Sequence, residues 1–121
     1  MALEHSALAW RVDVAFYAFT AAALVLAAIA LHTPGSGLLV LAWVGAGVVG
    51  WTLAEYLLHR FVLHGVAPFD RWHARHHHRP TALIGSPTVL SASLFVLLAA
   101  GPAGWTLGAG PACALLAGLT A

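Results

Sequence analysis

Hydrophobic residues fill two long stretches of the chain, and one short polar segment separates them. No Asp, Glu, Lys or Arg occurs from Val14 to Ala54, and none occurs from residue 80 to residue 121. Groups of turn-forming residues interrupt the two stretches at positions 32–37 and 101–104. The pattern therefore predicts about four transmembrane helices, the fourth of them incomplete, at residues 12–31, 38–58, 88–100 and 105–121.

This arrangement predicts a single all-α domain over residues 1–121, built as an integral membrane helical bundle with a His-rich helical loop between the second and third helices. The composition supports a membrane location. Hydrophobic residues make up 61% of the chain and charged residues 7%, whereas soluble domains contain roughly 25% charged residues. A soluble globule of this size is excluded, because small domains expose much of their surface to water.

Five arginines carry all of the basic charge, and four of them lie in the polar segment: Arg60, Arg71, Arg75 and Arg79. Arginine is enriched in the cytoplasmic loops of membrane proteins. We therefore expect residues 59–79 on the cytoplasmic side, of the inner membrane if the source is bacterial, and the turns at 32–37 and 101–104 on the opposite side. So few basic residues in so apolar a chain exclude a nucleic-acid-binding surface.

Three glycines, Gly45, Gly47 and Gly50, match the G-x-G-x-x-G pattern of dinucleotide-binding sites. That pattern requires a preceding strand and a helix N-terminus that is open to water, whereas these glycines lie within an expected membrane span. We interpret them as positions of close helix packing, together with Gly104 and Gly108.

Histidine is concentrated in the polar segment. The chain has eight histidines, and six of them fall between residues 59 and 78: His59, His64, His73, His76, His77 and His78. His73, His76 and His77 stand at i, i+3 and i+4, which places them on one face of a helix. Asp70 is expected to cap this helix, and Pro80 is expected to end it.

A second histidine pair closes the second span. Glu55 and His59 share one helix face, whereas His64 lies about 140° away from His59 in an ideal α-helix. Gly65 can end the helix and let His64 turn back toward His59. Imidazole is a neutral ligand that suits iron, zinc and copper, so the two groups of histidines together predict a metal site. Glu55 is expected to support His59 from outside the ligand set.

Three histidines are not expected to bind the metal. His78 lies about 40° beyond the main helical face, and His5 and His32 have no partner at ligand spacing, so both are expected to be ordinary interfacial histidines. A His-rich loop that only prefers the headgroup region is the alternative to a metal site. The i, i+3, i+4 register argues against it.

The segments WTLAEYLLHRFVLH (51–64) and HARHH (73–77) resemble the fatty acid hydroxylase / sterol desaturase superfamily over about residues 45–121. The H-x4-H and H-x2-H-H boxes match that family in type and order. The resemblance implies an integral-membrane, non-haem di-iron enzyme that hydroxylates or desaturates a lipid, using O2 and two electrons from a separate electron-transfer protein. It further implies two iron ions, or zinc in the isolated protein, and these metal ligands: His59, His64, His73, His76 and His77.

Members of this superfamily carry further histidine boxes after the fourth span, and the sequence stops at Ala121 before any such box. We therefore expect the 121-residue chain to be inactive alone. It is then either the N-terminal part of a longer enzyme or a truncated form, and activity of the chain alone would mean that a second copy in a homodimer supplies the missing ligands.

Two alternatives to this interpretation stay open. Carotenoid hydroxylases use the same chemistry and an H-x4-H-G pattern that His64-Gly65 fits, although the EYLLHRF phrase argues against them. A non-enzymatic haem or metal-binding membrane protein is the other alternative. A haem protein places one histidine on each of two spans near mid-membrane, and a metal transporter places its ligands at the bilayer centre. In this chain the histidines instead follow the end of a span.

Overall fold

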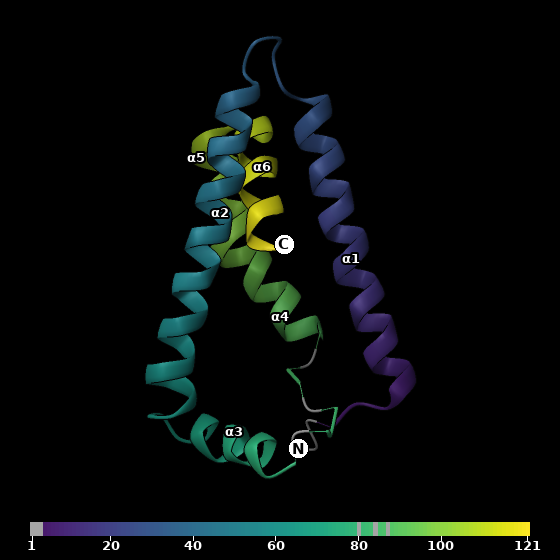
Figure 1. The fold of residues 1–121 in the computed structure, drawn as a ribbon, viewed down its shortest axis with the longest axis vertical. Coiled ribbons are helices and arrows are strands. Elements are labelled where there is room, and N and C mark those ends of the chain that lie inside the picture. Colours follow the sequence, from purple (N-terminus) through teal and green to yellow (C-terminus); the bar gives the residue numbers. More distant parts are fainter. Residues whose placement is uncertain (1–3, 80, 84, 87) are drawn as a thin grey trace.

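The computed structural model describes all residues except 1–3, 80, 84 and 87, and it leaves the side chain of His76 undescribed. The described backbone forms helices and their connections (Figure 1). Two π-helical segments, η1 and η2, continue α-helices without a gap. In chain order the elements are α1 (Ala7–Ala30), α2 (Gly37–Leu57), η1 (Leu58–Leu63), α3 (Phe69–His78), α4 (Thr88–Phe95), η2 (Val96–Ala100), α5 (Gly101–Leu107) and α6 (Ala109–Leu119).

Three continuous helices are long and apolar enough to cross a membrane: Ala7–Ala30, Gly37–Leu63 and Thr88–Leu107. Only 6% of the most apolar stretch of each helix is buried inside the structure. Apolar side chains that cover most of a helix surface are stable in lipid and unstable in water. The prediction of an all-helical fold is therefore confirmed for the described residues, and these three helices have the length and apolar surface that a membrane span requires, while α6, with 11 residues, is shorter than a span requires.

The predicted break at residues 101–104 is wrong. The helix continues from α4 through η2 to the end of α5. Pro102 is tolerated because the wider π-turn precedes it: the Gly101 N–H donates to the carbonyl of Val96, five residues back, which relieves the crowding that a proline ring causes in an α-helix. The chain turns instead at Gly108, whose φ of 77° favours glycine.

The core of the bundle is the contact of α6 with α1 and α2. The buried residues of α6 are small apart from one leucine: Ala112, Ala114, Leu116, Ala117 and Gly118. A Cβ added at Gly118 would lie 3.0 Å from the Cα of Gly47, so the backbones of α6 and α2 touch. Gly110 similarly lies against Leu31 at the end of α1. Small residues thus let three helices approach closely, as is typical of membrane bundles.

The packing role expected for glycine pairs is confirmed only in part. Gly47 packs against α6, and a Cβ at Gly50 would meet the side chain of Leu119 at 3.9 Å. In contrast, no atom of the described residues lies within 4 Å of a Cβ added at Gly45 or Gly104. The close helix packing expected at Gly104 and Gly108 is therefore wrong, since Gly104 faces open space and Gly108 forms the turn before α6.

The polar segment and the uncharged 32–37 turn lie at opposite ends of the bundle (Figure 1). α1 and α2 run from the shared turn toward the other end, where η1 leads into α3. α3 crosses below the spans, nearly perpendicular to them in this view. The predicted separation of the arginine-rich segment from the first turn is therefore confirmed, and its cytoplasmic placement stays a prediction.

Polar contacts join the start of the chain to the segment that leads from the end of α3 to the start of α4. His5 Nδ1 lies 2.9 Å from a carboxylate oxygen of Asp13, and the Thr88 hydroxyl donates to the other oxygen of the same carboxylate. Arg79 donates two hydrogen bonds of 3.0 Å to the carboxylate of Glu4. His5 thus has an acidic partner on α1, and it does not belong to the histidine cluster described below.

Candidate metal centre

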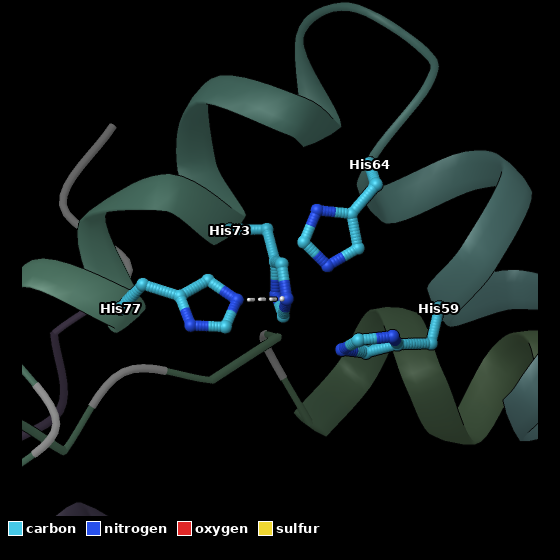
Figure 2. A group of neighbouring side chains, drawn as sticks. All are labelled: His59, His64, His73 and His77. Carbon is cyan, nitrogen blue, oxygen red and sulfur yellow. Dashed lines mark hydrogen bonds between the residues drawn. The ribbon is translucent and has the colours of Figure 1, made fainter.

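Four imidazoles from two neighbouring elements meet at one point (Figure 2). They belong to His59 on η1, His64 directly after it, and His73 and His77 on α3. One ring nitrogen from each lies within 4.8 Å of one ring nitrogen from every other. His73 is half-buried, and the other three are exposed. The cluster is therefore preorganised by the backbone but still open to solvent or lipid headgroups.

The π-helical geometry of η1 brings the first pair together. In an α-helix, residues five apart diverge by about 140°, whereas a π-helix pairs residue i with i+5. His59 and His64 are five apart, and their ring centroids lie 4.7 Å from each other. A Cβ at Gly65 would lie 2.6 Å from the carbonyl oxygen of Phe61, so this tight turn requires the absence of a side chain there. The expected return of His64 toward His59 is confirmed.

The second pair follows from α-helical spacing. His73 and His77 are neighbours at i and i+4 on α3. Their Nε2 atoms lie 3.0 Å apart, close enough for one ring to donate a hydrogen bond to the other (Figure 2). Asp70 lies in the first turn of α3, which begins one residue earlier, at Phe69, and its carboxylate accepts from the N–H of Arg71.

His73 is the centre of the cluster. Its ring centroid lies 4.7 Å from those of both His59 and His64, and 4.6 Å from that of His77. The direct separation of His64 from His77 is larger, at 5.5 Å. His73 therefore contacts its own partner, His77, and both members of the first pair. Its removal would take away the shortest ring contacts between the two pairs.

The nitrogen separations suit a single metal ion. Imidazole nitrogens bind zinc at about 2.0–2.1 Å in a tetrahedral arrangement, so two ligands of one ion lie about 3.4 Å apart. The nitrogens of the cluster lie within 4.8 Å of one another, so rotation of the side chains, three of which are exposed, has to bring them closer around one ion. Four neutral nitrogens form a donor set that fits iron, zinc or copper.

The structure brings together four of the five histidines that the sequence predicts as ligands. His76 lies on the same helix, but its side chain is outside the described part of the structure. His78 is exposed and does not belong to the group, as its helical position predicts. The Nδ1 atom of His32 interacts with the carbonyl of Ile29 at the other end of α1. The role of the four clustered histidines as ligands stays a prediction.

Glu55 does not take the supporting position expected for it. Its side chain is exposed, and among the described residues no hydrogen bond or ion pair joins it to His59. Glu55 lies one helical turn before His59, in the last turn of α2. The helix widens into η1 immediately afterwards, which removes the i,i+4 alignment that the α-helical argument assumed.

An open hollow of about 660 Å³ adjoins the cluster. Five residues line it: Tyr56, His59, Arg60, Phe61 and His64. Arg60 and Tyr56 were not among the sequence-predicted site residues. The signal that could have found them is their position near His59 at the end of a span, where a phenol and a permanent cation stand four residues apart.

Comparison with known proteins identifies no relative. No protein-family model, no curated protein and no solved structure matches this chain.

Proposed function

We propose that this protein is an integral-membrane metalloprotein that binds a transition-metal ion through His59, His64, His73 and His77. The observation that carries the proposal is the convergence of four imidazole nitrogens within 4.8 Å at the end of an apolar span. Buried metal ions need neutral or anionic donors in fixed positions, and two backbone elements supply them here without any contribution from chain ends or long loops. His76 is a further candidate ligand from the same helix.

We further propose that the metal site serves O2-dependent hydroxylation or desaturation of a lipid, with iron as the metal. The resemblance of residues 51–64 and 73–77 to the fatty acid hydroxylase / sterol desaturase superfamily motivates this step. Bound iron would supply the activation of O2. Hydroxylation inserts one oxygen atom into a C–H bond and reduces the other to water, which consumes two electrons and two protons, so the reaction needs an external electron donor.

The residues of this chain have two tasks in such a reaction. The four imidazoles hold the metal without adding negative charge at the membrane edge. The exposed apolar surface of the spans, including Leu53 and Leu57, gives a lipid direct access to the same end of the bundle. A lipid can therefore reach the cluster sideways from the bilayer and does not need to enter a closed internal cavity.

The number of ions follows from the number of donors. Four imidazoles that converge on one point suit one ion, and two iron ions with positions left for O2 require more ligands than these four. His76 and a second copy of the chain are the sources of further ligands that this proposal allows. Measuring the ratio of metal to protein separates a one-ion site from a two-ion site.

Metal analysis of the purified protein tests the proposal directly. The full chain, expressed in medium supplemented with iron and purified in detergent, should contain at least one equivalent of iron or zinc by mass spectrometry. The variant in which His59, His64, His73 and His77 are all replaced by alanine should contain less than a tenth of that. A wild-type protein without bound metal, and without affinity for added iron, zinc or cobalt, would refute the proposal.

An absorption spectrum and an activity assay distinguish the chemistries. A Soret band in the purified protein would show a haem protein and overturn the non-haem assignment. The iron-loaded protein in lipid nanodiscs, given O2 and a chemical reductant, is tested for oxidised lipid by mass spectrometry. The monomer is expected to bind metal without oxidising lipid, because its ligand set is incomplete for two ions. Metal binding without lipid oxidation in the dimer as well, where a second copy supplies further ligands, would leave a metal-binding membrane protein and refute the oxidase step.

A further inference from the structure

The hollow beside the histidine cluster has the chemistry of a headgroup site. It combines the guanidinium of Arg60 with the phenol of Tyr56, and both side chains are on its lining. Arg60 also lies over the ring of Phe61, with 5.8 Å between the guanidinium carbon and the ring centroid, which restricts the direction of the guanidinium. The volume of the hollow, about 660 Å³, is within the usual range of small-molecule sites, roughly 300–1,000 Å³.

Arg60 has no acidic partner in the described part of the chain, since the described ion pairs of the basic side chains involve Arg79 and His5. An arginine at the end of a membrane span carries a permanent charge and several N–H donors in a planar fork. This fork matches a carboxylate or a phosphate. The hollow therefore offers an anionic group a cation and a hydroxyl, beside neutral imidazoles that do not repel it.

An apolar stripe leads from the hollow along the span. Val49, Leu53 and Tyr56 follow one another at intervals of four and three residues, so they occupy one side of α2. Arg60 follows on η1 and lines the hollow together with Tyr56. Val49 is 68% exposed and Leu53 is 56% exposed. From Val49 to Arg60 the helix rises by about 16 Å. A hydrocarbon chain on this stripe would have its polar end at Arg60.

We propose that this hollow binds the anionic headgroup of a single-chain amphiphile, with its hydrocarbon chain along Val49 and Leu53. The head is a carboxylate or a phosphate, because the same guanidinium fork binds both. The binding follows from the hollow and the stripe alone. That this amphiphile is the substrate of the neighbouring metal site rests on the proposed function, which then gains a substrate class: lipids with an acidic head.

Binding is measured on the full chain in phosphatidylcholine nanodiscs, stripped of metal with a chelator. A spin-labelled stearic acid reports the immobilised fraction by electron paramagnetic resonance. Three competitors share one hydrocarbon chain and differ only in the head: hexadecanoate, hexadecyl phosphate and hexadecanol. Displacement by either anion at least about 10-fold better than by the alcohol is expected, because a charge-assisted contact is lost in the alcohol. Equal displacement by all three would overturn the proposal.

Variants locate the site. Arg60→Gln should weaken binding of the effective anion by about 10- to 100-fold, and Arg60→Lys should recover part of the loss because it retains the charge but not the fork. Arg71→Gln is the matched control, an equal loss of charge on α3 outside the hollow, and should change binding by less than about 2-fold. Equal losses in Arg60→Gln and Arg71→Gln would overturn the assignment to the hollow. If Arg60→Gln does not fold, the wild-type competition still decides.

The two anionic competitors distinguish the sources of the head. Preference for hexadecanoate assigns fatty acids, and preference for hexadecyl phosphate assigns phosphate-bearing lipids. The metal content of the same preparations is measured before stripping. Anion-selective binding in a protein that never holds metal would support the headgroup site in the hollow and refute the proposed oxidase. Normal metal binding with no preference for anions would refute only the headgroup site.

Discussion

Replacing His73 by alanine should weaken metal binding more than any other single change in the described cluster. His73 is the half-buried imidazole at its centre, with ring centroids of three other histidines within 4.7 Å. Structural zinc sites with four ligands bind with about 10–16 kcal/mol at neutral pH, so an equal share is about 2.5–4 kcal/mol per ligand. His73→Ala should therefore lower the affinity by about 10²- to 10³-fold.

Cobalt and zinc titrations of the full chain in detergent measure this effect. Cobalt bound to several imidazoles absorbs visible light, and zinc then displaces it in competition with a chelator of known affinity. His77→Ala should lose somewhat less affinity than His73→Ala, because His77 lies 5.5 Å from His64 by ring centroid and contacts fewer rings. Circular dichroism is expected to show unchanged helix content in both variants, since alanine favours helix at these positions.

His78→Ala is the matched control, because it removes an exposed imidazole from the same helix outside the cluster. It should change the affinity by less than about 3-fold. His76→Ala is informative in its own right, since the sequence predicts a ligand there. If His73→Ala bound metal as tightly as wild type, or if His78→Ala lost as much as His73→Ala, the four-imidazole site would be wrong.

Three further outcomes are expected. Gly118→Leu should destabilise the bundle by about 1–3 kcal/mol or more in a detergent unfolding assay, because its new side chain meets the backbone of α2, whereas Gly104→Leu faces open space and should be nearly neutral. Metal affinity should fall as the pH is lowered, because only neutral imidazole coordinates and protons compete with the ion; a titration that gave equal affinity at pH 5 and pH 8 would contradict imidazole ligands. In the same unfolding assay, Asp13→Ala should lower the free energy of unfolding by about 1–2 kcal/mol, because its carboxylate has two partners. Glu4→Ala, which removes an exposed carboxylate, should lower it by less than about 1 kcal/mol. Equal losses in the two variants would contradict this ranking.

Most of the fold was predictable because it follows from long-range polarity. The absence of charge over the two apolar stretches predicts helices in lipid, and the three longest helices occupy those stretches. The end of the third helix was not predictable from residue type alone. Pro102 is usually a helix breaker, but a π-turn before it removes the clash, and Gly108 becomes the turn. Only the backbone shows which glycine in such a run adopts a positive φ.

The candidate site was predictable where its geometry is local. His73 and His77 are one α-helical turn apart, so their proximity follows from spacing. The approach of His64 to His59 required a departure from α-helical geometry, for which Gly65 was the one visible signal. The hollow at Arg60 was missed because it depends on how η1 exposes neighbouring side chains, and no spacing rule describes that.

The cluster and the bundle core depend on different parts of the chain. The four histidines come from the short segment between residues 59 and 77, which holds them through η1, one turn and α3. The core instead requires α6, distant in sequence, to pack on α1 and α2 through small residues. Metal binding is therefore expected to stabilise the end of the second span and α3 without tightening the contact with α6. A substitution such as Gly118→Leu should loosen the bundle while the imidazoles keep their mutual geometry, so the metal affinity of that variant should stay within about 3-fold of the wild-type value.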